Sequence, residues 1–417
     1  MELKRVVVTG LGALTPIGNT VPEFWNSLIN GVSGAAPITK YDTTNFKTKF
    51  ACEVKNFNPE DFMDKKEARK LDPFVHFALA ATDEAVKDAG LDFEKFDTNR
   101  IGVIWGSGIG GLKTFFDEVV NYAKGDGTPR FNPFFIPKMI LDIAPGHISI
   151  KYGLRGPNFS TVSACASSTN ALIDSFNYIR LNMADIIVSG GSEAIINEAG
   201  MGGFNAMHAL STRNDDPTTA SRPFDKDRDG FVAGEGAGTI ILEELEHAKA
   251  RGAKIYAELI GGGMSADANH ITAPHPEGLG ARLVMTNALR DAGLTTSDID
   301  YINVHGTSTP LGDISESKAI VELYGENAYK LNISSTKSMT GHLLGAAGAI
   351  EAIASILAVK NDIIPPTINH FTDDPNVDPK LNLTFNKAQK RVVRAAQSNT
   401  FGFGGHNASV IFKKYEE

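Results

Sequence analysis

Cys165 lies in a run of small residues that could present it as a nucleophile. Before it, Phe159–Val162 has the β-branched and aromatic content of a short strand. After it, apolar residues from Ala171 to Ile179 recur at helical spacing, and Asp185–Gly191 is typical of a buried strand. The thiol therefore falls where a strand becomes a helix. We expect the helix N-terminus to lower its pKa below the free value of about 8.5, although a buried structural cysteine is the alternative.

Two histidines follow predicted strands later in the chain. His305 comes directly after Tyr301–Val304, and His342 follows Asn332–Ser335 through a short polar segment. Each lies where α/β proteins place ligands, although a single histidine there is more often structural. Together with Cys165 they could bind a metal, with Cys52 as a fourth ligand, or support covalent catalysis by a thiolate. The chain has no C-x-x-C or H-x-x-x-H pair, so the spacing favours catalysis.

Two further motifs resemble ligand-binding loops. Gly106–Gly111 matches G-x-G-x-x-G after a predicted strand, but Gly125–Pro133 is a loop where a dinucleotide site needs a second strand and an acidic residue. We expect these glycines to allow close packing beside a substrate channel. Asp225–Gly236 begins like a calcium loop, but its twelfth residue is glycine instead of glutamate. Structural ion pairs around Gly230–Gly238 are the preferred interpretation.

Composition and charge exclude several classes of protein. The 417 residues are 42% hydrophobic and 21% charged, which suits a soluble enzyme of two domains or one two-part fold. A net charge of −9 argues against nucleic acid as a partner. Two cysteines cannot form a disulfide framework, which indicates a reducing compartment. We find no signal peptide and no apolar run near the length of about 18 residues that a membrane span needs, and we expect a cytoplasmic protein.

Strand-like runs alternate with helical patterns along the whole chain, which predicts an α/β protein with parallel strands. Val6–Gly12 is interpreted as a first strand and its turn. A charged helix ends near residue 253, and Ile255–Gly263 repeats the pattern of a strand with a glycine-rich turn. This weak sign of duplication divides the chain into residues 1–253 and 254–417.

Two segments of the C-terminal half complete the set of predicted elements. Leu343–Val359 predicts a helix whose early turns are glycine and alanine, suited to tight packing. Asn399–Gly405 contains three glycines around Phe401 and Phe403 and predicts a flexible loop.

With these motifs in place, the chain resembles the β-ketoacyl-acyl-carrier-protein synthases, closest to the elongating synthase II type of bacterial fatty acid synthesis. The resemblance covers essentially the whole chain. It rests on the joint order of Val6–Gly12, Gly106–Gly111, Tyr152–Pro157, Phe159–Ala171, Leu210–Asn214, Arg228–Phe231, His305–Pro310, Lys337–Gly345 and Gly402–Gly405. It implies a thiolase-like fold, in which two similar α/β halves stack as five layers (αβαβα), with the site between them, in a homodimer.

The resemblance also implies roles for the reactive residues. Cys165 takes the acyl chain from acyl carrier protein as a thioester, and the backbone N–H groups of Cys165 and Phe403 form the oxyanion hole. His305 and His342 assist loss of CO2 from malonyl-carrier protein and stabilise the enolate. His342, expected at a helix N-terminus, should be neutral. The carbanion attacks the acyl thioester and gives 3-oxoacyl-carrier protein, without a metal or an organic cofactor.

Other positions match supporting residues of the family. Lys337 and Glu351 match residues that support the histidines, although a plain structural ion pair explains them equally well. The remaining matches are the pantetheine-contacting Thr307 and Thr309, the gating Phe401 and Phe403, the acyl-pocket Ile109, and Arg130 and Arg213 at the entrance. Lys66, Arg69 and Lys70 share a predicted helix face, which is either an ordinary solvated surface or a dock for acidic carrier protein.

Related enzymes differ at identifiable positions. The synthase III type pairs its cysteine with one histidine and an asparagine, whereas His342 supplies a second histidine here. Thiolases use a second catalytic cysteine, but Cys52 matches no thiolase motif. A non-catalytic chain-length partner subunit would lack Cys165. A condensing enzyme of a specialised polyketide or polyene pathway stays open, and so does the substrate subtype, since His406 stands where threonine is also common.

Overall fold

Ten strands form one hydrogen-bonded sheet in the computed structural model, which describes residues 3–416. The strands of its first half are β1 (Val6–Leu14), β4 (Ile101–Gly106), β5 (Asn158–Thr161), β6 (Ile186–Glu193) and β7 (Gly236–Glu244). Those of its second half are β8 (Ala257–Ala266), β9 (Tyr301–Asn303), β10 (Asn332–Ser334), β13 (Ala395–Gly402) and β14 (His406–Lys413). Two short pairs lie outside this sheet: β2 (Ala36–Pro37) with β3 (Phe50–Ala51), and β11 (Ile363–Ile364) with β12 (Gln389–Lys390).

The two halves of the sheet have the same strand order. The first half runs β5-β4-β6-β7-β1 and the second runs β10-β9-β13-β14-β8, so each reads third, second, fourth, fifth and first strand in chain order. In each half the first three of these pair in parallel, and the other neighbours are antiparallel. The halves join where Val6–Val8 pairs with Ala257–Leu259. The prediction of parallel strands therefore holds for three strands of each half and is wrong for the other two, because buried apolar runs carry no signal of strand direction.

Helices cover both halves of the sheet. Those of the first half are α1 (Val21–Ile29), α2 (Lys65–Ala68), α3 (Pro73–Asp88), α4 (Leu112–Lys124), α5 (Phe135–Met139), α6 (Ile143–Tyr152), α7 (Ser167–Arg180), α8 (Glu198–Ala206) and α9 (Leu245–Ala250). Those of the second half are α10 (Leu279–Ala292), α11 (Pro310–Tyr324), α12 (Lys337–Thr340) and α13 (Ala347–Asn361).

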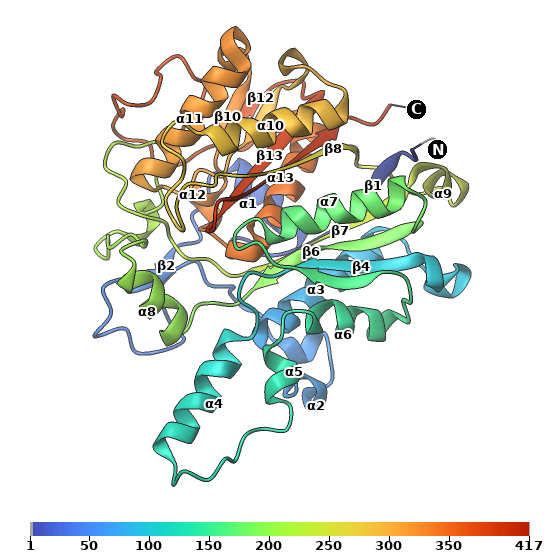
Figure 1. The fold of residues 1–417 in the computed structure, drawn as a ribbon, viewed down its shortest axis with the longest axis vertical. Coiled ribbons are helices and arrows are strands. Elements are labelled where there is room, and N and C mark those ends of the chain that lie inside the picture. The colour runs from blue at the N-terminus through green and yellow to red at the C-terminus, as the bar shows by residue number, and fades with distance from the viewer. Residues whose placement is uncertain (1–2, 417) are drawn as a thin grey trace.

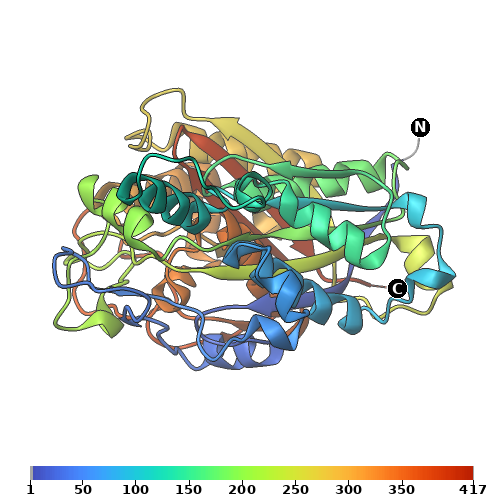
Figure 2. The same ribbon diagram turned by 90° about the horizontal axis from the view of Figure 1, so that it is seen from below.

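The helices and the sheet halves stack in five layers. Helices α3 and α6 pack on the outer face of the first half, and α10 and α11 lie on the outer side of the second (Figure 1). Between the halves lie α7 and α13, which contact each other and both halves. This arrangement confirms the predicted αβαβα fold. Figure 2 shows the two chain termini at the same end of the molecule, as Figure 1 does.

Helix α13 is apolar all round because it lies in the central layer. The segment Leu344–Asn361 has a mean hydropathy of 1.3 over 18 residues, which is long and apolar enough to cross a membrane. The expectation that no segment has this length and composition is therefore wrong. However, 89% of the segment is buried inside the protein. Its composition follows from contact with both halves of the sheet, as expected for a fully buried core helix.

Two predicted turns are parts of strands. Strand β1 continues through Gly10 and Gly12, where a Cβ atom would lie 2.5 Å from the Ala85 oxygen and 1.9 Å from the Ala81 oxygen of α3. These glycines allow a helix to approach the strand closely and make no turn. The predicted flexible loop at Asn399–Gly405 is mostly strand as well, since β13 runs to Gly402 and pairs there with β14.

Candidate active site

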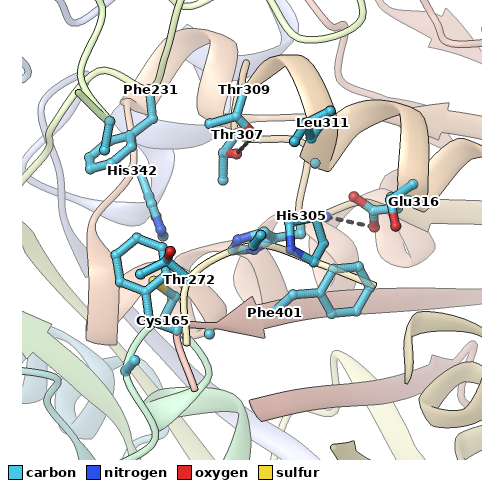
Figure 3. Close-up of a pocket in the computed structure, with 18 of the residues that line it drawn as sticks. Cys165, Phe231, Thr272, His305, Thr307, Thr309, Leu311, Glu316, His342 and Phe401 are labelled. Carbon is cyan, nitrogen blue, oxygen red and sulfur yellow. Dashed lines mark hydrogen bonds between the residues drawn. The ribbon is translucent and has the colours of Figure 1, made fainter. Parts of the chain in front are cut away.

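A cavity of about 670 Å³ opens between the two halves and is lined by segments from both. It brings together most of the residues that the sequence singled out as reactive or substrate-binding. They are Ile109, Cys165, His305, Thr307, Thr309, His342, Phe401 and Phe403. Figure 3 shows the His342 side chain pointing toward Cys165, with His305 beside Phe401.

Cys165 lies in the short connection between β5 and α7. Its neighbour Ala164 has a φ of +51°, a left-handed conformation that is uncommon for a residue with a side chain. Ala166 is the N-cap of α7, so Cys165 precedes the helix instead of starting it. The side chain is 7% exposed and faces the cavity. The chain therefore presents the thiol to the cavity on a strained turn.

Burial controls the acidity of this thiol. It raises the pKa of Cys165 to about 12, while the charge of Lys337 and the backbone N–H of Phe403 act in the opposite direction. The expectation of a pKa below 8.5 is therefore wrong. A helix dipole acts mainly within the first turn, whereas loss of water around a thiolate is a larger cost in this enclosed position. At neutral pH, burial therefore favours the protonated form of this thiol.

The two histidine rings meet edge to face beside the thiol. Their centroids are 5.3 Å apart at an interplanar angle of 87°, and the His342 ring also meets Phe231 edge to face at 5.4 Å. Burial, together with the charge of Lys337, holds the pKa of His305 and of His342 well below the usual 6.5. The prediction of a neutral His342 is confirmed, but the cause differs, since His342 follows the end of α12. Neutral imidazoles can donate a hydrogen bond without adding charge.

The backbone of the His305 loop is held by a buried carboxylate. The N–H groups of His305 and Gly306 donate to the two oxygens of Glu316, each at 2.9 Å. Burial raises the pKa of Glu316 to about 7. In the same loop the hydroxyls of Thr307 and Thr309 lie 3.1 Å apart at the cavity wall. The loop thus presents one imidazole and two hydroxyls from a fixed backbone.

Lys337 and Glu351 form an ion pair behind the histidines. The Lys337 Nζ donates to Glu351 Oε1, and both side chains are at most 2% exposed. Burial raises the pKa of Glu351 to about 7. The structure supports both interpretations of this pair, because the ion pair exists and the ammonium also lowers the pKa of both imidazoles.

The β13–β14 turn places a backbone donor beside Cys165. The backbone N–H of Phe403 lies near enough to the Cys165 thiol to act against the rise of its pKa. A Cβ atom on Gly402 would lie 2.5 Å from the Ser163 oxygen and 3.1 Å from the Cys165 nitrogen. Only a glycine lets the two segments come this close. The Cys165 and Phe403 N–H groups, for which the family resemblance implies an oxyanion hole, therefore lie on adjacent segments.

The structure bears on two further interpretations from the sequence, the ion pairs near Gly230–Gly238 and a metal site that includes Cys52. The predicted structural ion pairs are confirmed, since Arg228 binds Asp374 at 2.7 Å and Asp313 at 3.4 Å. Cys52 lies outside the lining of the cavity, against Gly341. Within residues 3–416 no three His, Cys, Asp or Glu side chains are grouped as a metal site requires. The four-residue metal site considered from sequence thus has no geometric support.

The basic residues proposed for docking lie outside the cavity lining. Helix α2 ends at Ala68, so the predicted helix face is wrong: Arg69 caps the helix and Lys70 lies beyond it. The Lys70 ammonium binds Glu67 at 2.6 Å, while Lys66 and Arg69 are exposed. The other two cations are also engaged: Arg130 pairs with Asp126 in the loop after α4, and Arg213 donates to the Asp227 oxygen.

Sequence reasoning missed two buried carboxylates, Glu193 and Glu316. Glu193 ends β6 and accepts hydrogen bonds from the loop that carries Ile109. Its signal was a carboxylate at the end of a buried strand, two residues after the pair Gly190 and Gly191. Glu316 could have been suspected because it lies on the helix after the His305 loop.

Comparison with known proteins covers the whole chain. Residues 3–248 match the family described as "Beta-ketoacyl synthase, N-terminal domain", and residues 256–371 match "Beta-ketoacyl synthase, C-terminal domain". The chain is 50% identical over 416 residues to 3-oxoacyl-[acyl-carrier-protein] synthase 2 of Synechocystis sp. (strain ATCC 27184 / PCC 6803 / Kazusa), covering 100% of this chain and 99% of that protein.

Two solved structures share the fold. The ishigamide ketosynthase/chain length factor superimposes with a TM-score of 0.92 at 36% identity, over 99% of this chain and 100% of that chain. AntDE:AntF, a type II PKS acyl-carrier protein in complex with its ketosynthase, superimposes with a TM-score of 0.89 at 34% identity, over 99% of this chain and 100% of that chain. Fold, cavity and sequence agree, and the chain belongs to the β-ketoacyl synthase family.

Proposed function

We propose that this protein is a 3-oxoacyl-[acyl-carrier-protein] synthase of the elongating II type, an acyltransferase that lengthens fatty acids by two carbons. One observation carries the proposal: a cavity-facing thiol, two neutral imidazoles and the backbone N–H of Phe403 converge in one cavity. Its 50% identity to a 3-oxoacyl-[acyl-carrier-protein] synthase 2 along the full length supports the choice of type.

The first step is transfer of the acyl group to Cys165. Sulfur attacks the thioester carbonyl of acyl-carrier protein, the N–H groups of Cys165 and Phe403 stabilise the oxyanion, and the pantetheine thiol leaves. The thiol proton ends on the pantetheine sulfur, so the step consumes no net proton. The charge of Lys337 and the Phe403 N–H offset part of the cost of forming a buried thiolate.

The second step uses the imidazoles. Donors from His305 and His342 stabilise the thioester oxygen of malonyl-carrier protein while the bond to its carboxylate breaks and CO2 leaves. The Nδ1 atoms of both rings are buried and have no hydrogen-bond partner among residues 3–416, so we assign the donors toward the substrate to the Nε2 atoms. The electron pair of the resulting enolate forms a carbon–carbon bond to the Cys165 acyl group. The Cys165 sulfur then leaves as a thiolate and takes one proton from solvent.

The walls of the cavity suit the two parts of the substrate. The hydroxyls of Thr307 and Thr309 offer hydrogen bonds to the amides of a pantetheine arm. Ile109 and Phe401 are apolar lining residues for the acyl chain. The Phe401–Gly405 turn is proposed as a gate, because Gly404 and Gly405 adopt left-handed φ values of +86° and +75° that favour glycine.

Acyl- and malonyl-loaded carrier proteins are the proposed partners. AntDE:AntF, a structure of similar fold, is a type II PKS acyl-carrier protein in complex with its ketosynthase. Since this chain has a net charge of −9, an acidic partner needs local positive charge to approach it. We assign this role to Lys66, Arg69 and Lys70 with Arg130 and Arg213.

A homodimer is proposed through the edge strand β5. The opposite edge, β10, is covered, since Ile333 donates to the Asn382 oxygen, while β5 ends the sheet on its side. Val162, which follows β5, is 61% exposed, and Ile150 in the preceding helix is 76% exposed. An open edge with exposed apolar neighbours suits a second copy related by a two-fold axis. Sedimentation of wild-type protein and of Val162→Arg tests this, and a wild-type monomer would contradict it.

The two proposed domains correspond to the two halves of the sheet. We propose that residues 1–253 form the half that carries the nucleophile, and that residues 254–417 form the half that carries the histidines and the Gly402–Gly405 turn.

Intact-mass analysis tests the proposed function most broadly. The protein is mixed with acyl-carrier proteins of different chain lengths, and malonyl-carrier protein is then added. We expect the mass of one acyl group on Cys165, followed by its loss and the appearance of 3-oxoacyl-carrier protein. No adduct would overturn the proposal. Product from polyketide-type starters alone would instead favour a specialised condensing enzyme.

A further inference from the structure

The glycine-rich loop after β4 wraps around a buried side chain of its own protein. Glu193 is 0% exposed, and its Oε2 accepts N–H groups from Gly108 at 2.7 Å and Gly345 at 3.0 Å. Its Oε1 accepts N–H groups from Ile109 at 3.1 Å and Gly110 at 3.3 Å. A motif that could have bound a phosphate therefore binds a carboxylate from the neighbouring strand.

No cation neutralises this carboxylate. Among residues 3–416, Glu193 takes part in no salt bridge, so its partners are four backbone N–H groups and the Ser107 hydroxyl. Burial raises the pKa of Glu193, and the backbone N–H groups that it accepts act in the opposite direction. The four converging N–H groups need two acceptor oxygens, which neither an apolar residue nor an amide would supply.

The glycines at this contact have no room for a side chain. A Cβ atom on Gly345 would lie 2.2 Å from the Gly108 nitrogen and 2.7 Å from Glu193 Oε2. A Cβ atom on Gly108 would lie 2.8 Å from the same oxygen and 3.4 Å from the Ala164 oxygen. The carboxylate thus joins the acyl-pocket loop to the segment that follows His342, directly beside the turn that carries Cys165.

We propose that Glu193 is a positioning residue that fixes Ile109 at the acyl-pocket wall and thereby sets which acyl chains reach Cys165. The inference rests on the proposed function and deepens it. Ile109 lines the cavity and Glu193 does not, so the carboxylate holds the loop from behind. Releasing the loop moves Ile109 toward the space that a long acyl chain needs.

Glu193→Gln tests this with an isosteric change. The amide nitrogen would face N–H donors and leave two of them without an acceptor, because one oxygen can no longer serve both. The rate of Cys165 acylation is measured with hexanoyl- and dodecanoyl-carrier protein. We expect the dodecanoyl rate to fall about tenfold relative to the hexanoyl rate, the scale of a changed apolar contact in a specificity pocket.

Glu84→Gln is the matched control. Glu84 also accepts two backbone N–H groups, from Ala13 at 2.8 Å and Val21 at 2.7 Å, but it lies outside the cavity lining. A loss of general stability would lower both acylation rates equally in both variants. Ile109→Ala in the Glu193→Gln background should remove the effect of Glu193→Gln on the chain-length ratio, because the two residues act through one contact.

Gly345→Ala gives a second route if Glu193→Gln does not fold. The added methyl pushes the same two segments apart and keeps the carboxylate, so the ratio should shift in the same direction. An unchanged ratio in the folded variants, or an equal shift in Glu84→Gln, would overturn the inference. A wild-type protein that is not acylated at all would instead overturn the proposed function, and this inference with it.

Discussion

The two halves of the molecule repeat one strand order and use it for different chemistry. After the third strand of each half, β5 or β10, the chain reaches Cys165 in one and His342 in the other, and a central helix follows. After the second strand, β4 or β9, comes the Ile109 loop in one half and the His305 loop in the other. Equivalent strand ends thus supply the proposed nucleophile and acyl pocket on one side, and the two imidazoles on the other.

In both loops, backbone N–H groups donate hydrogen bonds to a buried carboxyl group. Glu193 accepts the N–H groups of Gly108, Ile109 and Gly110, and Glu316 accepts those of His305 and Gly306. The charges differ, however, because the second half contributes the buried ammonium of Lys337. That ammonium lowers the pKa of both imidazoles and opposes the effect of burial on Cys165. The nucleophile therefore depends on the half to which it does not belong.

The largest loss of activity is expected from a substitution at the contact between the two halves, which would separate their contributions to acyl loading. Gly402→Val places a side chain against the Ser163 oxygen and the Cys165 nitrogen, which displaces the Phe403 N–H. Acyl loading should slow by about 100–1,000-fold, the usual cost of losing an oxyanion donor. Stopped-flow acylation measures it. Gly146→Val, at a helical glycine with open space around it, is the control, and equal loss in both variants would argue against the turn.

A smaller and more selective effect is expected from Glu316→Gln. Losing hydrogen bonds to a buried carboxylate costs about 1.5–3 kcal/mol, which is roughly tenfold or more in rate. Because the His305 loop belongs to the second half, release of labelled CO2 should fall while Cys165 acylation is unchanged. Glu322→Gln, an exposed change on the same helix, should alter neither rate. Loss of acylation in Glu316→Gln would contradict the division of roles.

The pH dependence of Cys165 alkylation tests how burial between the two halves affects the thiol. A pKa raised to about 12 leaves the thiol protonated at neutral pH, so alkylation of Cys165 should keep accelerating as pH rises past about 8.5. Cys165 should still react well before Cys52, whose pKa is equally raised, because only Cys165 faces the cavity. The measurement is mass-spectrometric labelling against pH. A plateau of the alkylation rate near neutral pH, or equal rates for both cysteines, would contradict the conclusion that burial controls the pKa of Cys165.

The smallest effect concerns the surface, away from both loops. Reversing Lys66 and Arg69 to glutamate should lower kcat/KM for acyl-carrier protein severalfold through slower association, and the loss should shrink at high salt. A small acyl-pantetheine thioester should react as before. Lys318→Glu with Lys380→Glu makes the same change in net charge elsewhere on the surface. If this control lowers kcat/KM equally, net charge and not a local dock is responsible.

The sequence predicted where the site residues lie better than it predicted the pKa of the thiol or the buried partners of the loops. Strand ends locate Cys165, His305 and His342 because apolar runs mark buried strands, and reactive residues follow them. The thiol pKa was predicted wrongly because it depends on burial between two halves, which a local pattern does not contain. Strand direction was missed for the same reason. Glu193 and Glu316 were missed because their partners are backbone N–H groups brought near by the fold.

The central claim is that the first half supplies the nucleophile for covalent loading and the second half supplies the imidazoles for decarboxylation. It is tested by measuring acyl-enzyme mass and labelled CO2 release together in Cys165→Ala, His305→Ala and His342→Ala. The account predicts that Cys165→Ala forms no acyl-enzyme, while both histidine variants load the acyl group on Cys165 and lose most CO2 release. Wild-type CO2 release from both histidine variants, or an acyl adduct on Cys165→Ala, would contradict it.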